Sequence, residues 1–214
     1  MLGPAAETPP WTLGQRALKR GLDFLLSSSA LVVLGPGLLA VGLLVRWTSP
    51  GPALFRQERI GRGGRPFFIL KFRTMHSGAE ACGPQITAAG DARVTPLGRI
   101  LRKTKVDELP QLLNVALGHM SLVGPRPEVP LYVREYSPQD RAVLAVRPGI
   151  TDLASIAFRD EESILAQYPD RERAYREVVL PRKLALAHQY IREQGLFTDL
   201  GILLRTFVAI ARPS

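Results

Sequence analysis

An uncharged, apolar stretch from Phe24 to Val45 is the feature that most constrains how this chain can fold. The stretch is long enough for a transmembrane helix, which needs about 20 apolar residues. Near its middle stands Gly35-Pro36-Gly37, where the proline removes a helix hydrogen bond and the glycines permit a sharp bend. We therefore expect a membrane helix over residues 13–47 that is broken at Gly35 and Pro36.

Basic residues flank this stretch on both sides. They are Arg16, Lys19 and Arg20 before it, and Arg46, Arg56 and Arg59 after it. Because basic flanks favour the cytoplasmic side of a membrane, the pattern favours a re-entrant helix hairpin with both ends in the cytoplasm. A kinked spanning helix remains the main alternative, since proline is tolerated in such helices. A buried pair of core helices would need a larger soluble protein to cover it, and the length of the run disfavours a cleaved signal peptide.

We expect residues 48–214, after the membrane helix, to form a cytoplasmic domain. Residues 1–12, before that helix, are expected to be a loose tail. The 214 residues carry a formal net charge of +9. Such a surface attracts anions, which include nucleic acid, lipid headgroups and phosphorylated small molecules. The single cysteine, Cys82, excludes an internal disulfide, and the three histidines lack metal-ligand spacing.

Two adjacent carboxylates, Asp107 and Glu108, follow a cluster of basic residues and precede an apolar helical run. The nearby cations favour the ionised carboxylates and attract phosphates. Neighbouring helical residues point about 100° apart, so the two acids would have separate roles. Alternatively, Asp107 is only the N-cap of the next helix, and Leu112, Leu113 and Leu117 face the core. Both interpretations can hold together, since a helix N-terminus also stabilises an ionised carboxylate.

The pattern of the cytoplasmic domain predicts an α+β fold that is mostly helical. Residues 53–60 and 66–75 read as a β-hairpin, with Lys71 and Arg73 on one face. Residues 154–158 suggest a short strand, and a helix over residues 171–194 is expected to be interrupted near Pro181. Residues 196–210 predict an amphipathic helix that either packs on the core or lies in the membrane interface.

Two further arginines stand on stiff loops. Arg126 lies between Pro125 and Pro127, and Arg147 precedes Pro148. A rigid loop loses little entropy when its arginine binds a phosphate, although either loop could equally be a structural turn. Several arginines and a carboxylate pair suit phosphoryl transfer, in which a carboxylate can attack phosphorus and a divalent metal bridges the phosphate oxygens.

Five motifs, in order and covering about residues 15–212, resemble those of the bacterial sugar transferases, the small monotopic phosphoglycosyl transferases. The motifs are Lys19-Arg20-Gly21-Leu22-Asp23-Phe24, Lys71-Phe72-Arg73-Thr74-Met75, Lys105-Val106-Asp107-Glu108-Leu109-Pro110-Gln111, Ser121-Leu122-Val123-Gly124-Pro125-Arg126-Pro127 and Arg147-Pro148-Gly149-Ile150-Thr151. The resemblance implies transfer of a sugar-1-phosphate from a UDP-sugar to polyprenol (undecaprenyl) phosphate, with release of UMP. It also implies a re-entrant helix at the cytoplasmic face of the bacterial inner membrane.

The resemblance implies a role for each matching residue. Asp107 corresponds to the nucleophile that forms a phosphosugar intermediate, and Glu108 to its partner, with both acids as ligands of Mg²⁺. The expected phosphate-binding residues are Lys71, Arg73, Arg102, Arg126 and Arg147. The expected donor pocket contains Gln111, Pro125, Pro127 and Thr151. Expected partners are the UDP-sugar, polyprenol phosphate, membrane lipids and downstream glycosyltransferases, but not nucleic acid.

One departure concerns Thr151-Asp152-Leu153, where many relatives continue from threonine with Gly-Trp. It leaves the identity of the sugar open.

Two other functions remain as alternatives. A membrane-tethered nucleic-acid binder would explain the charge, but the basic residues lack interleaved aromatics. A catalytically inactive scaffold of an envelope-polysaccharide complex is the second, although both Asp107 and Glu108 are present.

Overall fold

The structure, a computed structural model, describes residues 11–79, 86–87 and 90–211. Most of the expected N-terminal tail and Cys82 lie outside the described residues. In chain order the elements are α1 (Leu13–Thr48), β1 (Leu54–Ile60), η1 (Arg62–Gly64), β2 (Pro66–Phe72), α2 (Pro96–Lys103), η3 (Val106–Glu108), α3 (Gln111–Ala116), β3 (Ser121–Val123), α4 (Pro130–Val133), η4 (Asp140–Ala145), β4 (Gly149–Thr151), α5 (Leu153–Ala157), α6 (Glu161–Ala166), α7 (Arg171–Ala174), η5 (Tyr175–Val179), α8 (Leu180–Glu193) and α9 (Leu196–Ala211).

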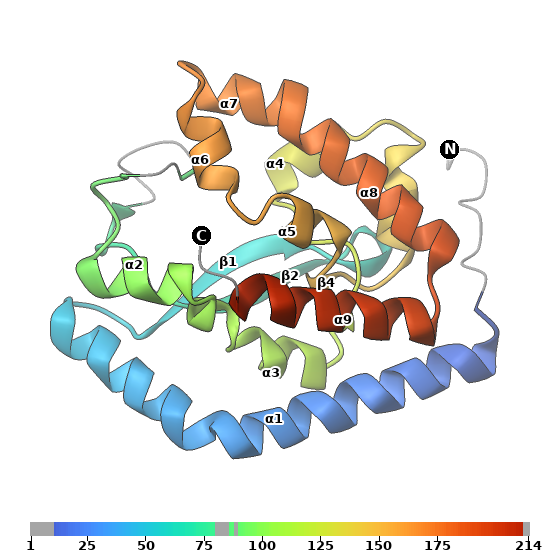
Figure 1. The fold of residues 1–214 in the computed structure, drawn as a ribbon, viewed down its shortest axis with the longest axis horizontal. Helices are drawn as coiled ribbons and strands as arrows, with labels where there is room; N and C mark the ends of the chain where they lie inside the picture. Colours follow the sequence, from blue (N-terminus) through green and yellow to red (C-terminus); the bar gives the residue numbers. More distant parts are fainter. Residues whose placement is uncertain (1–10, 80–85, 88–89, 212–214) are drawn as a thin grey trace.

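Helix α1 is, among the described residues, the one helix long and apolar enough to cross a membrane, judged by length and composition. It begins with a capping box, in which Thr12 and Gln15 exchange hydrogen bonds between side chain and backbone. Pro36 lies inside the helix. Figure 1 shows α1 bent near its middle, with both ends turned toward the rest of the molecule. The helix therefore bends without ending, which agrees with the lost hydrogen bond at a proline.

The predicted β-hairpin is confirmed, because β1 pairs antiparallel with β2 from Leu54 opposite Phe72 to Ile60 opposite Pro66. A second, parallel pair joins β3 to β4, which the sequence did not predict. The expected strand at residues 154–158 is wrong, since residues 154–157 lie in helix α5 and Phe158 is its C-cap. Asp152 explains the difference, because its Oδ1 accepts a hydrogen bond of 2.6 Å from the Ser155 backbone N–H and caps that helix.

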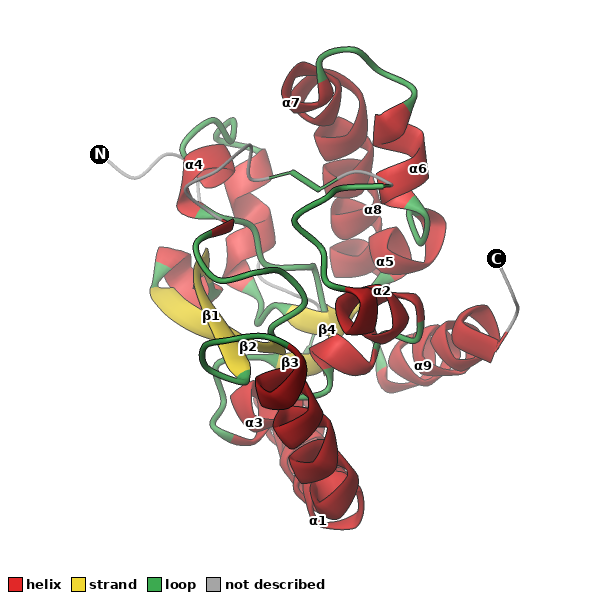
Figure 2. Ribbon diagram, turned by 90° about the vertical axis from the view of Figure 1, so that its left-hand side faces the viewer, coloured by secondary structure: helices red, strands yellow, loops and turns green. Residues whose placement is uncertain are grey.

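The largest hydrophobic cluster lies between α4, α6 and the α7–α8 segment, above the hairpin in Figures 1 and 2. Its buried members include Val129, Tyr132, Leu165, Tyr175 and Val179. The predicted interruption of this long helical segment is confirmed, because a π-helical turn, η5, separates α7 from α8 just before Pro181. These helices form the side of the domain opposite α1.

Two surfaces on the side of α1 expose apolar side chains. In α3, which lies beside α1, Leu112 is buried, but Leu113 is 42% exposed, and Leu117, the C-cap of α3, is 61% exposed. The prediction that all three leucines face the core is therefore wrong for two of them. Helix α9 buries Asp199 and Ile202 and exposes its other face. The exposed side chains there are Leu196, Phe197, Leu200, Leu204, Phe207, Val208 and Ile210.

Candidate active site

The carboxylate pair lies on a helical segment that continues from η3 into α3. Lys105, in the left-handed region with φ of 58°, precedes the turn, and Leu109 and Pro110 keep helical dihedral angles. The interpretation of Asp107 as an N-cap is wrong, because Asp107 lies within η3 and Pro110 occupies the N-cap position of α3. Its carboxylate is thus not used to begin the helix.

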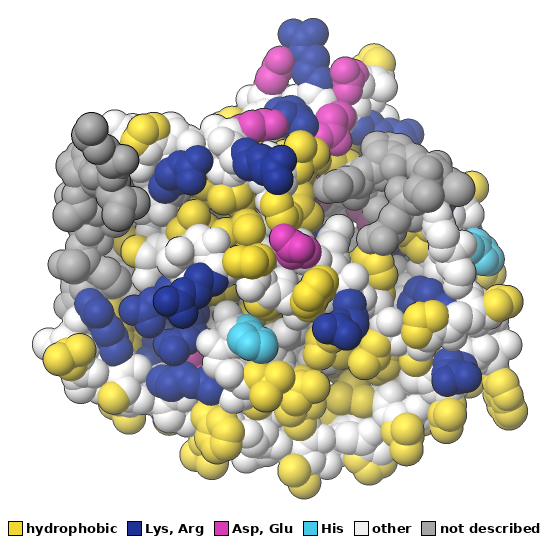
Figure 3. Space-filling view, turned by 180° about the vertical axis from the view of Figure 1, so that it is seen from behind, with side chains coloured by type: hydrophobic (Ala, Val, Ile, Leu, Met, Phe, Trp, Pro, Cys, Tyr) yellow, Lys and Arg dark blue, Asp and Glu magenta, His cyan; other side chains and the backbone are white. Residues whose placement is uncertain are grey.

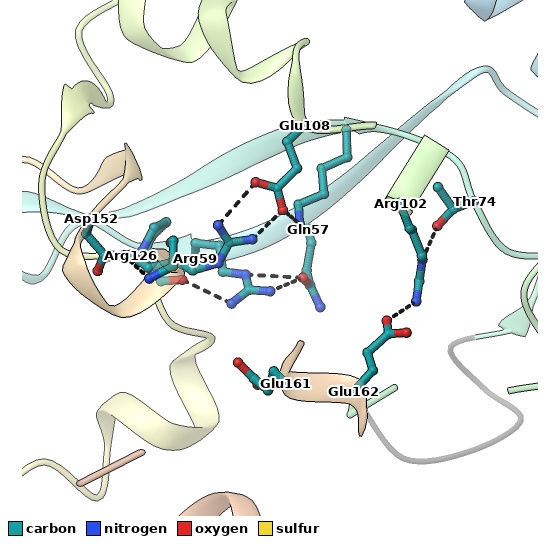
Figure 4. A network of polar contacts seen from close by, with 12 residues as sticks. Gln57, Arg59, Thr74, Arg102, Glu108, Arg126, Asp152, Glu161 and Glu162 are labelled. Carbon is teal, nitrogen blue, oxygen red and sulfur yellow. Dashed lines mark hydrogen bonds and ion pairs between the residues drawn. The ribbon is translucent and has the colours of Figure 1, made fainter. Parts of the chain in front are cut away.

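Glu108 is held by two cations. Lys71 Nζ donates a hydrogen bond of 2.9 Å to its Oε1, and Arg126 donates to both oxygens, at 2.5 Å to Oε1 and 3.2 Å to Oε2. Figure 4 shows the Arg126 contact. Although burial opposes ionisation, Arg126 and Lys71 hold the pKa of Glu108 well below its usual value. Glu108 therefore acts as a fixed negative charge that orients two cations.

Asp107 has the opposite environment. Its side chain is buried, and its Oδ1 has no hydrogen-bond partner among the described residues. Burial and the neighbouring charge of Glu108 raise the pKa of Asp107 to about 6, against the opposing effect of Lys71. The nearby cations favour ionisation of both carboxylates, as expected, but at Asp107 burial and the charge of Glu108 outweigh them. A raised pKa makes the ionised Asp107 more basic and more reactive than an exposed carboxylate.

Gln111 lies four residues after Asp107 and so on the same face of the helical segment. It is fully buried, and neither its Oε1 nor its Nε2 has a hydrogen-bond partner within the described chain. Buried amides almost always have partners, so this pair of unsatisfied groups is unusual. A polar ligand or an ordered water beside Asp107 would satisfy both side chains.

The other predicted residues near this site occupy its rim. Arg102 donates to Thr74 Oγ1 at 2.9 Å and to Glu162 Oε1 at 2.8 Å, as Figure 4 shows. The Arg126 backbone N–H donates to Asp152 Oδ2 at 3.1 Å, which fixes the loop that contains Pro125 and Pro127. These two prolines line a small pocket with Ile60, Gly61, Arg126, Glu128, Tyr136, Val143, Leu144, Val146 and Pro148.

Three predicted site residues lie elsewhere. Arg73 follows the end of β2, and its buried guanidinium donates at 2.6 Å to each of the Ser49 and Pro50 carbonyls after α1. Arg147 Nε donates at 3.0 Å to the Gly118 carbonyl, beyond the opposite end of α3 from Asp107. Thr151 Oγ1 shares a hydrogen bond of 2.7 Å with Thr206 of α9. Their bonds are structural, and they do not join the carboxylate pair.

Sequence reasoning missed Arg59. Its Nη2 donates at 2.7 Å to Gln57 Oε1 and its Nη1 at 3.0 Å to the Pro127 carbonyl, while Glu128 lies 3.6 Å away. Figure 4 shows Arg59 beside Arg126. Burial lowers the pKa of Arg59, partly offset by Glu128. The signal was present in the alternation of β1, which puts Gln57 and Arg59 on one face.

A resident metal site is not evident, because the described residues contain no group of three or more histidine, cysteine or acidic side chains that could hold an ion. The unsatisfied Asp107 Oδ1 suits Mg²⁺, which prefers oxygen ligands. Glu108 does not fit in this arrangement, since both its oxygens accept from cationic donors. A magnesium ion here would need further oxygens from a bound substrate.

Comparison with known proteins supports the resemblance. The model of a family described as "Bacterial sugar transferase" matches residues 14–213. The UDP-glucose:undecaprenyl-phosphate glucose-1-phosphate transferase of Caulobacter vibrioides is 43% identical over 193 residues, 88% of this chain and 67% of the relative. An Aeromonas hydrophila relative is 42% identical over 65% of this chain. It is a UDP-N-acetylgalactosamine-undecaprenyl-phosphate N-acetylgalactosaminephosphotransferase, of which the match covers only 34%.

A third relative, an exopolysaccharide production protein of Rhizobium leguminosarum, is 46% identical over 65% of this chain and 73% of its own length. The matched region therefore makes up between about a third and three quarters of these relatives. The family match, by contrast, extends over nearly the whole chain and includes every element from α1 to α9. The chain belongs to the bacterial sugar transferase family.

Proposed function

We propose that this chain transfers a sugar-1-phosphate from a UDP-sugar to undecaprenyl phosphate, with Asp107 as the nucleophile. The observation that carries this proposal is the contrast between the two carboxylates. Both oxygens of Glu108 accept hydrogen bonds from Lys71 or Arg126, whereas Asp107 is buried with an unpartnered Oδ1 and a raised pKa. A nucleophile needs an oxygen that is not occupied by cationic donors, and Asp107 Oδ1 meets that condition, whereas neither Glu108 oxygen does.

In the first step an Asp107 carboxylate oxygen attacks the phosphorus that bears the sugar. The new bond joins that oxygen to phosphorus, while the bond from phosphorus to the bridging oxygen of the diphosphate breaks. UMP leaves with this oxygen and its electron pair. The product is an Asp107 phosphosugar, which divides one difficult transfer into two easier steps.

In the second step a phosphate oxygen of undecaprenyl phosphate attacks the same phosphorus. The bond from phosphorus to Asp107 breaks, which restores the carboxylate and forms undecaprenyl diphosphosugar. Because the acceptor's phosphate lies at the level of the lipid headgroups, the site must lie at that boundary. The product would feed downstream glycosyltransferases of polysaccharide or glycoconjugate synthesis.

The cations around Asp107 would bind the substrate phosphates. Lys71, Arg102 and Arg126 are already oriented by carboxylates, and a phosphate can replace a carboxylate on a guanidinium with similar geometry. Gln111, Pro125 and Pro127 would line the donor pocket. Asp107 would help to hold Mg²⁺, which would supply positive charge that neutralises the phosphate oxygens.

The proposal places α1 as a re-entrant helix at the cytoplasmic face of the inner membrane. The bend of α1, with both ends turned toward the domain, supports this placement (Figure 1). The exposed apolar faces of α3 and α9, on the same side, would lie in the membrane interface. The relatives' names include both glucose and N-acetylgalactosamine, so the donor sugar stays open.

The test is UMP release from a panel of UDP-sugars by the lipid-embedded full chain, with Mg²⁺ and undecaprenyl phosphate. We expect release with one or a few donors and its loss in Asp107→Asn. Without acceptor, intact-mass measurement should show a sugar phosphate added to the wild type but not to Asp107→Asn. If the folded protein released no UMP with any donor of the panel, the proposal would be refuted and a catalytically inactive scaffold would be favoured.

A further inference from the structure

A second cationic cluster lies away from the carboxylate pair. It consists of Arg20 of α1, Arg62 of η1 and Arg147 of the loop before β4, three residues from distant parts of the chain. Arg20 and Arg147 flank Gly118: Arg147 donates to its carbonyl, and a Cβ added to this glycine would lie 3.3 Å from the Arg20 guanidinium. Arg62 Nε donates at 3.2 Å to the carbonyl of Ala145, two residues before Arg147.

The cluster carries more positive than negative charge. Burial lowers the pKa of Arg147, and the charges of Arg62 and Arg20 lower it further. The one acidic side chain that opposes this effect is Asp23, whose Oδ1 already accepts a hydrogen bond from the Leu122 backbone. Since like charges repel, three guanidiniums so placed stabilise a bound anion.

Arg62 and Arg147 retain free donors. Each donates only through its Nε, and the Nη atoms of both have no hydrogen-bond acceptor among the described residues. Arg20, by contrast, donates both Nη groups at 2.7 Å to the Val115 and Ala116 carbonyls at the end of α3. Arg20 therefore fixes the site, and Arg62 and Arg147 offer the planar donor pairs that suit a phosphate.

The position of the cluster points to a lipid. Arg20 lies one helical turn before Phe24, where the uncharged stretch of α1 begins, and its guanidinium carbon lies over the Phe24 ring, 6.0 Å from the ring centroid. Leu117, 61% exposed, directly precedes Gly118. Figure 3 shows the back of the molecule, where Lys and Arg side chains gather above a band of hydrophobic side chains. Phosphate-binding donors beside apolar surface match a phospholipid, whose headgroup adjoins its acyl chains.

The site is separate from Asp107. The helical segment that carries Asp107 ends at the cluster, and the ten residues between Asp107 and Gly118 span about 15 Å at the rise of an α-helix. A phosphate bound by Arg147 therefore cannot react at Asp107. We propose that Arg62 and Arg147, positioned beside Arg20, bind the headgroup phosphate of an anionic bilayer phospholipid. This inference rests on the proposed membrane placement of α1.

The test measures thermal unfolding of the full chain in nanodiscs of phosphatidylcholine alone or with phosphatidylglycerol, without UDP-sugar. Wild type should unfold about 2–4 °C higher with phosphatidylglycerol, because a ligand of the native state stabilises it. Arg62→Gln/Arg147→Gln should lose most of that rise, and Arg62→Gln alone should lose part. The matched control is Arg182→Gln/Arg192→Gln, which removes two charges from α8 on the opposite side and should keep the full rise.

Other outcomes would overturn the inference. A wild type indifferent to phosphatidylglycerol would exclude the site, and an equal loss in the control would show diffuse charge attraction. An equal rise in phosphatidylcholine nanodiscs with inorganic phosphate would show an anion site without lipid. The same rise with undecaprenyl phosphate but not phosphatidylglycerol would assign the cluster to the acceptor. UMP release is measured separately, so failure of the catalytic proposal and failure of this one are distinguishable.

Discussion

Asp107 and Gln111 lie one helical turn apart, and both are buried with side-chain polar atoms that lack hydrogen-bond partners in the described chain. Leaving such groups unsatisfied costs about 1–3 kcal/mol each. Natural proteins retain this cost mainly at functional sites, where activity and stability compete. The pairing therefore marks this face of the segment as the place where substrate groups complete the polar contacts.

Gln111→Met tests whether the unsatisfied amide of Gln111 lowers stability but is needed for activity. Methionine has a similar volume but no amide, so it removes an unsatisfied buried group. We expect the free energy of unfolding to rise by about 1 kcal/mol or stay unchanged, while kcat for UMP release falls about tenfold or more. Chemical unfolding and steady-state kinetics on the same preparation give both values. A variant that loses stability and activity together would instead assign Gln111 to the packing of α3.

The raised pKa of Asp107 predicts how activity depends on pH. Burial raises this pKa to about 6, and the nucleophile must be ionised. UMP release should therefore increase from pH 5 to a plateau above about pH 7, with a midpoint near 6. Glu108 should not contribute a step there, because its pKa lies well below its usual value. A profile of kcat/KM for the donor that is flat between pH 5 and 7 would contradict the assignment, because kcat/KM reports the pKa values of the free enzyme.

The same shift has a consequence for stability. A carboxyl with a raised native pKa binds its proton more tightly in the folded than in the unfolded chain, so its contribution lowers stability as pH rises from about 4 to about 6. Above that range the cost is fully present. Asp107→Asn should therefore be more stable than the wild type by about 1–3 kcal/mol at pH 8, and this difference should shrink near pH 4.

Much of the architecture followed from local sequence patterns. The apolar run predicted α1, the alternation on either side of Gly61 to Gly64 predicted the hairpin, and the periodicity of residues 196–210 predicted α9. The parallel pair of β3 and β4 was missed because each strand has only three residues and pairs over a long sequence separation. The strand expected at residues 154–158 failed because the cap at Asp152 outweighed a short apolar run.

The site was predicted in part. Asp107, Glu108, Lys71 and Arg126 come together, as the family resemblance implied. Arg73 and Arg147 do not join them. The sequence could not show this difference, because the spacing of residues does not tell whether an arginine binds a ligand or a backbone carbonyl. That choice depends on tertiary contacts, such as the end of α1 lying against the residue after β2.

Arg73 should therefore behave as a structural residue. Arg73→Met removes hydrogen bonds to the Ser49 and Pro50 carbonyls. Pro50 keeps the Ser77 hydroxyl as a donor, whereas Ser49 is buried and loses the guanidinium. We expect a loss of about 2–3 kcal/mol in the free energy of unfolding and an unchanged KM for the donor in the folded fraction. Arg126→Met is the comparison, since it should raise that KM. A raised KM for Arg73→Met at unchanged stability would return Arg73 to the substrate site.

The topology of α1 can be tested through its two ends. In a Cys82→Ser background without cysteine, Ala17→Cys and Pro52→Cys place single thiols before and after the apolar stretch, both at exposed positions. With a re-entrant helix, a membrane-impermeant maleimide should label both only in inside-out vesicles, as it labels the control Arg192→Cys on α8.

Replacing Gly35, Pro36 and Gly37 together by alanine restores the hydrogen bond and raises helix propensity at the bend. The straightened helix should then cross the bilayer, so that Ala17→Cys is labelled only in right-side-out vesicles. If the native bend already gave this opposite labelling, α1 would be a kinked spanning helix, and the re-entrant placement would be wrong.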